Sequence, residues 1–102
     1  MTPDERTALN EAVCKRLGWT DTGGGTWLPM GLSARIIQPD FTSDWNAVYR
    51  WIVPAVKEMG MVARTRFAEL LIWHHGDDTP VPWFLYATPE DYCRAFLAIE
   101  GD

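Results

Sequence analysis

The same helix-starting device occurs near both ends of this chain, and it constrains the fold more than any other feature. Thr2-Pro3-Asp4-Glu5 and Thr88-Pro89-Glu90-Asp91 each place a threonine, a proline and two acids in succession. A threonine can cap the first turn, proline fits the first helical position, and acids favour the positive end of the helix dipole. Apolar residues follow each device at helical spacing. We therefore predict a first helix that ends at Gly18 and a last helix that Gly101 closes.

Three consecutive glycines, residues 23–25, lie between two short aromatic and β-branched segments, Trp19-Thr20 and Thr26-Trp27-Leu28. Glycine adopts the positive φ angles that tight turns require, so the pattern predicts a hairpin. Asp21-Thr22-Gly23 matches the active-site triplet of aspartic proteases, but no apolar strand leads into it. A phosphate-binding loop would need a helix directly after the glycines. The segment that follows, Trp27-Leu28-Pro29, cannot start a helix.

The middle of the chain predicts a short strand, from Ala34 to Ile37, and then a second helix. Thr42 or Ser43 can cap this helix, and Gly60 suits its end. Pro54 lies inside it and predicts a kink or a break. The expected buried stripe consists of Trp45, Val48, Ile52, Val56 and Met59.

Residues 61–75 and 81–87 complete the predicted secondary structure. We favour a helix from Thr65 to His75, although alternating residues fit a strand equally well from Met61 to Phe67. Val81 to Ala87 predicts a strand that is apolar on both faces. The chain forms one domain, residues 1–102. The order of elements predicts an α+β fold in which a small, mostly antiparallel sheet carries helices on both faces, an α-β-α sandwich.

Charge and apolar content argue against two classes of partner. The net charge is −5, with nine Lys and Arg against fourteen Asp and Glu, so little basic surface is left for nucleic acid. No apolar run approaches the length of about 18 residues that spans a membrane.

The opening MTPDERTALN does not resemble a signal peptide, so we expect a cytoplasmic protein. Cys14 and Cys93 are expected to be reduced and buried.

Tryptophan is over-represented, with six in 102 residues. A core of this size cannot easily bury six indoles and satisfy every ring N–H, so we expect one or two of them to be partly exposed. Trp and Arg anchor protein interfaces and hold nucleotide bases. The candidate binding residues are Trp51, Trp73, Trp83, Arg50 and Arg66.

Three groupings could support chemistry, but each has a simpler structural interpretation. The run from His74 to Asp78 holds four residues of metal-ligand type in five positions. Side chains of neighbouring helical residues point in different directions, so such a run rarely forms a metal site. The end of a helix followed by an acidic turn accounts for the same pattern. Asp40 and Asp44 flank a helix start, where carboxylates have structural roles. Cys93 lies on an apolar helix face. We therefore predict no catalytic set, no metal and no cofactor.

Four segments together resemble a known family. Gly18-Trp19, Trp27, Pro39 to Ala47 (PDFTSDWNA) and Ala87 to Ala98 are similar to recurring motifs of the small phage ABA-sandwich domain proteins of tailed phages and prophages. The PDFTSDWNA segment is the most specific of the four, and residues 60–82 depart from the pattern. The resemblance implies an α-β-α sandwich and a phage or prophage origin. It implies no reaction, because no catalytic residues carry over from that family.

These observations favour a non-enzymatic phage accessory protein that acts in the host cytoplasm by binding a host or phage protein, for instance by blocking a host protein or defence component. Two alternatives stay open. The protein could sequester a signalling nucleotide in a pocket lined by Trp and Arg, or it could be a metal-dependent hydrolase that uses His74, Asp77 and Asp78. Homo-oligomers are also expected, because excess aromatic surface in a short chain tends to be buried between copies.

Overall fold

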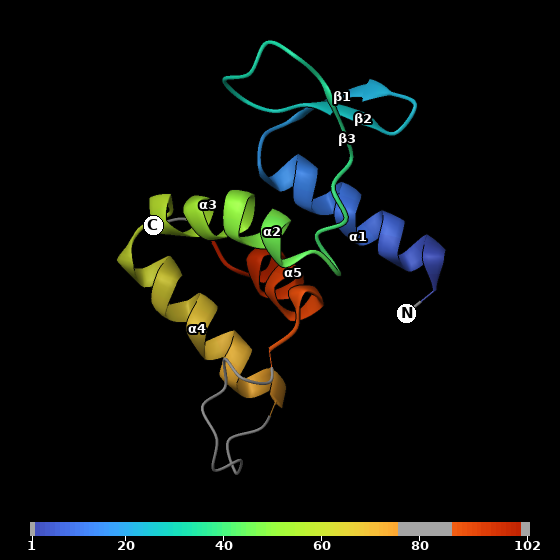
Figure 1. Cartoon of the computed structure of the whole chain (residues 1–102). Coiled ribbons are helices and arrows are strands. Elements are labelled where there is room, and N and C mark those ends of the chain that lie inside the picture. Colours follow the sequence, from blue (N-terminus) through green and yellow to red (C-terminus); the bar gives the residue numbers. More distant parts are fainter. Residues whose placement is uncertain (1, 76–86, 101–102) are drawn as a thin grey trace.

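The computed structural model of the chain describes residues 2–75 and 87–100 as a small sheet and a group of helices (Figure 1). In chain order the elements are α1 (Pro3–Arg16), β1 (Thr20–Gly23), β2 (Thr26–Leu28), β3 (Ile36–Ile37), α2 (Trp45–Ala47), the π-helical turn η1 (Val48–Ile52), α3 (Val53–Glu58), α4 (Met61–His75) and α5 (Pro89–Ala98). In Figure 1 the strands lie together above α1, and the remaining helices lie beside and below it. We call α2, η1 and α3 together the middle helix.

The predicted α+β fold class is confirmed, with a three-stranded antiparallel sheet in the order β1-β2-β3. Trp27 of β2 pairs with Ile36 of β3, and the Trp27 side chain is buried. Ile37, the next residue of β3, is 81% exposed, because successive side chains of a strand point to opposite faces. The described residues thus show one covered face of the sheet, and they do not show helices on both faces.

The predicted hairpin is present and turns at the three glycines. Gly23, Gly24 and Gly25 have φ angles of 84°, 63° and 76°, in the left-handed region that other residues rarely adopt. Asp21 Oδ1 accepts a hydrogen bond from the Gly23 N–H at 2.9 Å, so this carboxylate stabilises the turn. The strand after the hairpin, Ile36–Ile37, is shorter than predicted.

Helix α1 ends at the predicted glycine. Gly18 has a φ angle of 80°. The N–H groups of Gly18 and Trp19 donate to the carbonyls of Lys15 and Cys14, respectively. This pair of hydrogen bonds is a Schellman motif, and it reverses the chain so that Trp19 packs into the core.

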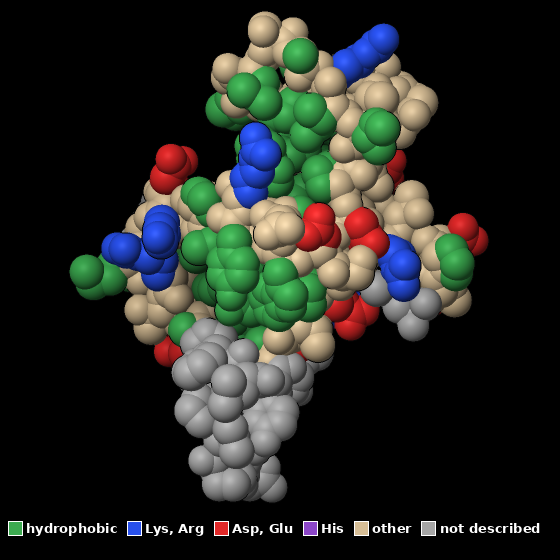
Figure 2. Space-filling model, in the orientation of Figure 1, with side chains coloured by type: hydrophobic (Ala, Val, Ile, Leu, Met, Phe, Trp, Pro, Cys, Tyr) green, Lys and Arg blue, Asp and Glu red, His purple; other side chains and the backbone are tan. Residues whose placement is uncertain are grey.

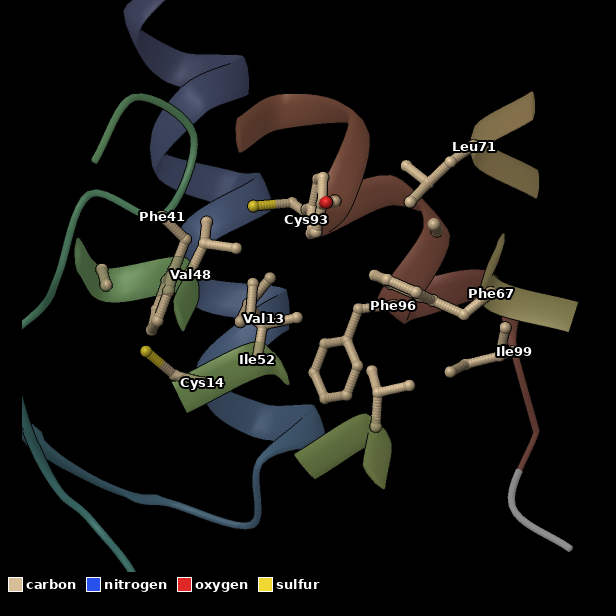
Figure 3. Packing of buried hydrophobic residues seen from close by; sticks show 14 of the residues in the cluster. Val13, Cys14, Phe41, Val48, Ile52, Phe67, Leu71, Cys93, Phe96 and Ile99 are labelled. Carbon is tan, nitrogen blue, oxygen red and sulfur yellow. The ribbon is translucent and has the colours of Figure 1, made fainter. Parts of the chain in front are cut away.

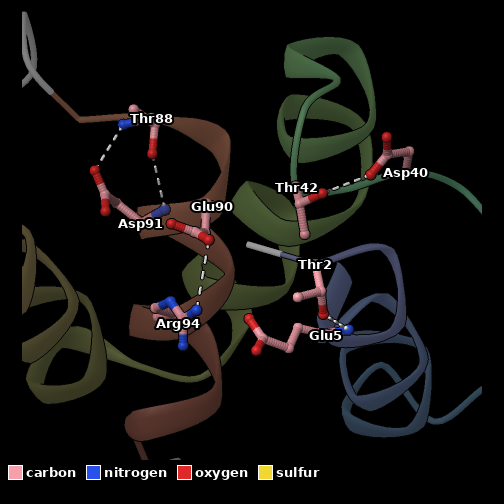
Figure 4. Close-up of polar contacts among 8 residues, drawn as sticks. All are labelled: Thr2, Glu5, Asp40, Thr42, Thr88, Glu90, Asp91 and Arg94. Carbon is pink, nitrogen blue, oxygen red and sulfur yellow. Dashed lines mark hydrogen bonds and ion pairs between the residues drawn. The ribbon is translucent and has the colours of Figure 1, made fainter. Parts of the chain in front are cut away.

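Both capping threonines act as predicted (Figure 4). Thr2 Oγ1 accepts a hydrogen bond from the Glu5 N–H at 3.1 Å. Thr88 Oγ1 accepts from the Asp91 N–H at 3.2 Å, and the Asp91 carboxylate accepts from the Thr88 N–H at 2.8 Å. Helix α5 therefore begins with a complete capping box, which fixes the direction in which the helix enters the core.

The middle helix contains a π-helical turn, η1, directly before Pro54. Proline has no N–H to donate to the carbonyl of Arg50, and its ring would crowd that carbonyl in a regular helix. The Val53 N–H donates to the carbonyl of Val48, five residues back. The kink or break predicted at Pro54 is therefore a π-helical turn, which contains one residue more than a regular α-helical turn.

The predicted buried stripe of the middle helix holds only in part. Val48, Ile52 and Val56 are buried and Met59 is partly buried, but Trp45 is 37% exposed, so the prediction for Trp45 is wrong. Three residues of a helix cover about 300°, so Trp45 lies about 60° around the axis from Val48. It therefore lies at the edge of the buried stripe, where it contacts Tyr92.

Residues 61–75, whose first half fitted a helix or a strand from sequence, are helical throughout and form α4 (Met61–His75). The helix favoured from Thr65 to His75 is confirmed, and the strand alternative for Met61 to Phe67 is wrong. The strand predicted from Val81 to Ala87 lies outside the described residues except for Ala87. Helix α5 ends at Ala98, and its predicted terminator, Gly101, also lies outside them.

One hydrophobic core joins α1, the middle helix, α4 and α5 (Figure 3). Helix α5 lies at its centre, since α1, η1 and α4 all pack against α5. Among the buried residues are Val13 and Cys14 of α1, Val48 and Ile52 of η1, Ala63, Phe67 and Leu71 of α4, and Tyr92, Cys93 and Phe96 of α5. These side chains form one connected core among the described residues.

Replacing Thr88 with alanine should destabilise the protein more than replacing Thr2. Each variant loses a hydroxyl cap, but Thr88 belongs to a reciprocal, partly buried box at the central helix, whereas the hydrogen bond to the Thr2 hydroxyl is exposed to solvent. We expect Thr88→Ala to lower the free energy of unfolding by about 1 kcal/mol and Thr2→Ala by roughly 0.3 kcal/mol, measured by urea denaturation. Equal losses would contradict these assigned roles.

Candidate functional site

Two of the predicted binding residues, Arg50 and Trp51, come together on η1. The central carbon of the Arg50 guanidinium lies 5.0 Å from the centroid of the Trp51 ring. Trp51 also meets Trp19 edge to face, with ring centroids 4.9 Å apart. Trp51 is therefore partly buried between a cation and a second indole, and it extends the core more than it presents a surface.

Of the other three predicted binding residues, only Arg66 has a described side chain. Its guanidinium lies 3.3 Å from the Glu69 carboxylate on α4, in an exposed ion pair of the kind that contributes little to stability. Trp73 belongs to α4, but its side chain and the whole of Trp83 lie outside the described residues. The structure thus brings together two of the five predicted residues.

An exposed aromatic cluster, which the sequence analysis missed, lies at the start of the middle helix. The rings of Trp45 and Tyr49 stack with centroids 5.6 Å apart and planes 25° apart. Tyr92 of α5 contacts both rings edge to face, at 5.2 Å from Trp45 and 6.5 Å from Tyr49. Phe67 of α4 meets Tyr92 at 5.5 Å. We call Trp45, Tyr49 and Tyr92 the aromatic surface.

The stacked pair of the aromatic surface is open to solvent. Trp45 is 37% exposed and Tyr49 is 59% exposed, whereas Tyr92 is buried. Figure 2 shows hydrophobic side chains gathered over the middle helix, with acidic side chains beside them. The exposed Trp45 and Tyr49 rings thus pack against a buried ring, that of Tyr92.

Local sequence explains how these rings come to share one face. Asp44 Oδ1 accepts a hydrogen bond from the Asn46 N–H at 2.9 Å and so caps the helix that begins at Trp45. Trp45 and Tyr49 are four residues apart, and that spacing places two side chains on the same side of a helix. The four-residue spacing of two aromatic residues, Trp45 and Tyr49, was the sequence signal that could have pointed to this face.

The hydroxyl of Tyr92 is a neutral phenol at physiological pH. Burial raises the pKa of Tyr92 above its usual value, and the charge and hydrogen bond of the neighbouring Tyr49 raise it further. A phenol with a raised pKa does not act as a base near neutral pH. The aromatic surface therefore suits non-covalent recognition.

Asp40, one of the two carboxylates considered as an acid–base pair, has a structural role (Figure 4). Its carboxylate accepts hydrogen bonds from Thr42 Oγ1 at 2.6 Å, from Asn10 Nδ2 at 3.1 Å and from Ser43 Oγ. Burial alone would raise the pKa of Asp40, but these hydrogen bonds and the positive charge of Arg6 hold it below its usual value. The carboxylate thus ties the turn before the middle helix to α1.

Both cysteines are buried and unpaired by a disulfide, as predicted. Their side chains lie within the core (Figure 3). Burial raises the pKa of Cys14 and of Cys93 to about 12, and nearby acids add to the effect. Because the thiolate is the nucleophile, neither thiol is poised for attack.

The remaining candidate chemistry falls mostly on residues that are not described. The side chain of His74, and all of Asp77 and Asp78, lie outside the described part of the chain. Within that part, no three His, Cys, Asp or Glu side chains gather closely enough to hold a metal ion.

A hollow of about 200 Å³ between α4 and α5 is lined by Leu70, Asp91, Arg94, Ala95 and Ala98.

Searches found no protein-family model, no curated protein and no solved structure that matches the chain. The resemblance to phage ABA-sandwich proteins therefore stays a prediction. Among the helices of residues 2–75 and 87–100, none is long and apolar enough to cross a membrane. Any functional proposal has to start from the geometry of the described surface.

Replacing Asp40 with asparagine should make stability less sensitive to acid. The pKa of Asp40 is lower in the folded protein than its value of about 3.9 in an unfolded chain. Its charge therefore stabilises the fold at neutral pH, and that stabilisation is lost as the pH falls through the folded-state pKa. We expect the difference in unfolding free energy between wild type and Asp40→Asn to shrink from about pH 6 to about pH 3.

Urea denaturation at several pH values measures this difference. Asp21→Asn, which removes one charge from an exposed turn, is the matched control. A difference between wild type and Asp40→Asn that stays constant over this pH range would contradict the assigned role.

Cys14 and Cys93 should resist alkylation in the folded protein. Both thiols are buried and protonated, so we expect iodoacetamide to modify them at least about 100-fold more slowly than an unstructured cysteine peptide at the same pH. Mass spectrometry with and without denaturant gives the two rates. Fast modification of folded Cys93 would revive the interpretation of this residue as a nucleophile.

Proposed function

We propose that this protein acts by binding another protein through the aromatic surface formed by Trp45, Tyr49 and Tyr92. The observation that carries the proposal is the exposed stack of Trp45 and Tyr49. Water contact with these rings is unfavourable, and burial against a partner would remove it. Aromatic residues are enriched at the centres of protein interfaces and carry much of their binding free energy.

The aromatic surface is held in place before any partner arrives. Tyr92 contacts both exposed rings, and Phe67 in turn packs against Tyr92. These contacts link the surface to α4 and α5, so the rings have little side-chain freedom left to lose on binding. A preformed surface of this kind binds with a smaller entropy cost.

Of the five binding residues predicted from sequence, Arg50 is the one that lies next to the aromatic surface in the chain. Arg50 follows Tyr49 in the chain and is exposed, so it can donate hydrogen bonds at the rim of an interface. Trp51 packs against Trp19 and belongs mainly to the interior. Arg66, Trp73 and Trp83 stay candidates for further contacts.

The biological setting in our proposal is that of a phage or prophage accessory protein in the host cytoplasm. The partner would be a host or phage protein, for instance a defence component that the interaction blocks. The sequence resemblance is the support for this setting and for an α-β-α sandwich. Homo-oligomers belong to the same proposal, because a second copy could also cover the exposed rings.

The two alternative functions have less support. Nucleotide sequestration needs a pocket lined by Trp and Arg, and the described residues that line the hollow between α4 and α5 include no aromatic residue. A metal-dependent hydrolase would depend on His74, Asp77 and Asp78, whose side chains are not described. The exposed rings therefore favour a non-enzymatic binding role.

A photoreactive benzoylphenylalanine at position 49 should cross-link to a protein partner in a lysate of the bacterial host. The same group at position 37 is the matched control, because Ile37 is also an exposed apolar residue but lies on the sheet. Trp45→Ala should reduce the cross-link, and we expect affinity for the recovered partner to fall about 30-fold, equivalent to about 2 kcal/mol. Circular dichroism checks that the variant folds.

Equal cross-linking from positions 37 and 49, or capture that Trp45→Ala leaves unchanged, would argue against the proposed surface. A cross-link between two copies of the chain would identify the partner as the protein itself. Size-exclusion chromatography with light scattering would then show the dimer, and Trp45→Ala should shift it to monomer.

A further inference from the structure

We infer that the aromatic surface takes a cationic segment of its partner, which places an arginine or lysine side chain over the stacked Trp45 and Tyr49 rings. This inference rests on the proposed function and specifies the chemistry of the partner. It draws on the exposed rings, on the charge beside them and on the way this chain arranges its own cations.

The geometry of the stack suits a flat cation. The faces of Trp and Tyr rings carry negative potential and attract a Lys or Arg side chain that lies within about 6 Å of the ring centroid. The planes of Trp45 and Tyr49 differ by only 25°, so a guanidinium that lies flat on the open face of one ring is nearly parallel to the other. The edge-to-face contact with Tyr92 fixes the orientation of Trp45.

The chain already uses this interaction at two other rings. Arg50 lies over Trp51 at 5.0 Å, and Arg16 lies over Phe96 at 5.9 Å. All nine Lys and Arg residues fall within residues 2–75 and 87–100, and none of them lies over Trp45 or Tyr49. The most exposed aromatic stack of the described residues therefore lacks the cation that two more buried rings have.

The charge beside the stack is negative. Asp44 precedes Trp45, is exposed, and has no ion-pair partner among the side chains that are described. The Asp44 N–H donates to the carbonyl of Asp40, so a second carboxylate belongs to the same turn. The whole chain carries a net charge of −5, which attracts a positively charged partner over a distance of about 10 Å at moderate salt.

Other occupants fit the surface less well. A purely apolar segment would cover the rings but would also take Asp44 out of water without a compensating charge, which is costly. Nucleic acid would bring phosphates towards a negatively charged edge. A cationic segment satisfies the rings and the carboxylate together, because its side chain can stack while its charge interacts with Asp44.

The test is an NMR titration with two synthetic peptides. The probe is acetyl-Gly-Arg-Gly-Arg-Gly-amide, and its partner carries citrulline, a neutral residue of nearly the same shape, in place of each arginine. We expect the arginine peptide to shift the Trp45 indole N–H and Tyr49 ring signals in a saturable manner. The citrulline peptide should bind at least about fivefold more weakly, which corresponds to the loss of one cation–ring contact.

Two variants locate the interaction. Tyr49→Leu should weaken binding of the arginine peptide by about fivefold, because it removes one ring of the stack. Asp44→Asn keeps a good helix cap and should weaken binding of the arginine peptide but not of the citrulline peptide. Asp21→Asn removes the same charge from the distant hairpin and should leave the affinity within about twofold of wild type.

The outcomes separate this inference from the function on which it rests. Equal shifts by the two peptides, or no shift at Trp45, would overturn the inference, while a specific cross-link from position 49 would still support protein binding. Arginine-specific shifts without any cross-link would support the cation preference and overturn the role in binding a protein. Arginine-specific shifts together with the cross-link would support both.

Discussion

The missing backbone N–H of Pro54 is the constraint that shapes the middle helix. A regular helix would require a donor at this position, and the chain forms a π-helical turn, Val48–Ile52, immediately before it. Val48 and Ile52 of this turn lie in the core, whereas Trp45 and Tyr49 lie on the neighbouring side of the same helix and reach the surface. The middle helix thus has a buried face and an exposed face.

Helix α5 connects these two faces. Its capping box at Thr88 sets the start of the helix, and Phe96 fills the centre of the core. Tyr92, one turn earlier than Phe96, packs between Phe67 and the exposed Trp45–Tyr49 stack. Each aromatic contact adds about 0.5 to 1.5 kcal/mol beyond simple burial. The exposed rings are therefore supported by the core, and a change in Tyr92 would alter both stability and the geometry of the exposed stack.

The polar and sulfur groups with catalytic potential have structural roles in the described residues. Asp40 holds the turn before the middle helix against α1, and Asp21 stabilises the hairpin. Cys14 and Cys93 are protonated members of the core. These assignments leave the aromatic surface without a role inside the described core, while single apolar side chains such as Ile37 and Met61 are exposed elsewhere. We propose recognition of a cationic protein segment as the role of this surface, in keeping with the net charge of −5.

The sequence by itself determined the local structure, because caps and turns act within a few residues of backbone. The Thr-Pro starts of α1 and α5, the turn at Gly23 to Gly25 and the stop at Gly18 all follow from residue chemistry at those positions. It also predicted partly exposed indoles, but it could not identify Trp45 as one of them. Only the tertiary structure decided that, because the exposure of Trp45 depends on how the middle helix packs against α5 and on contact with Tyr92, which lies far along the chain.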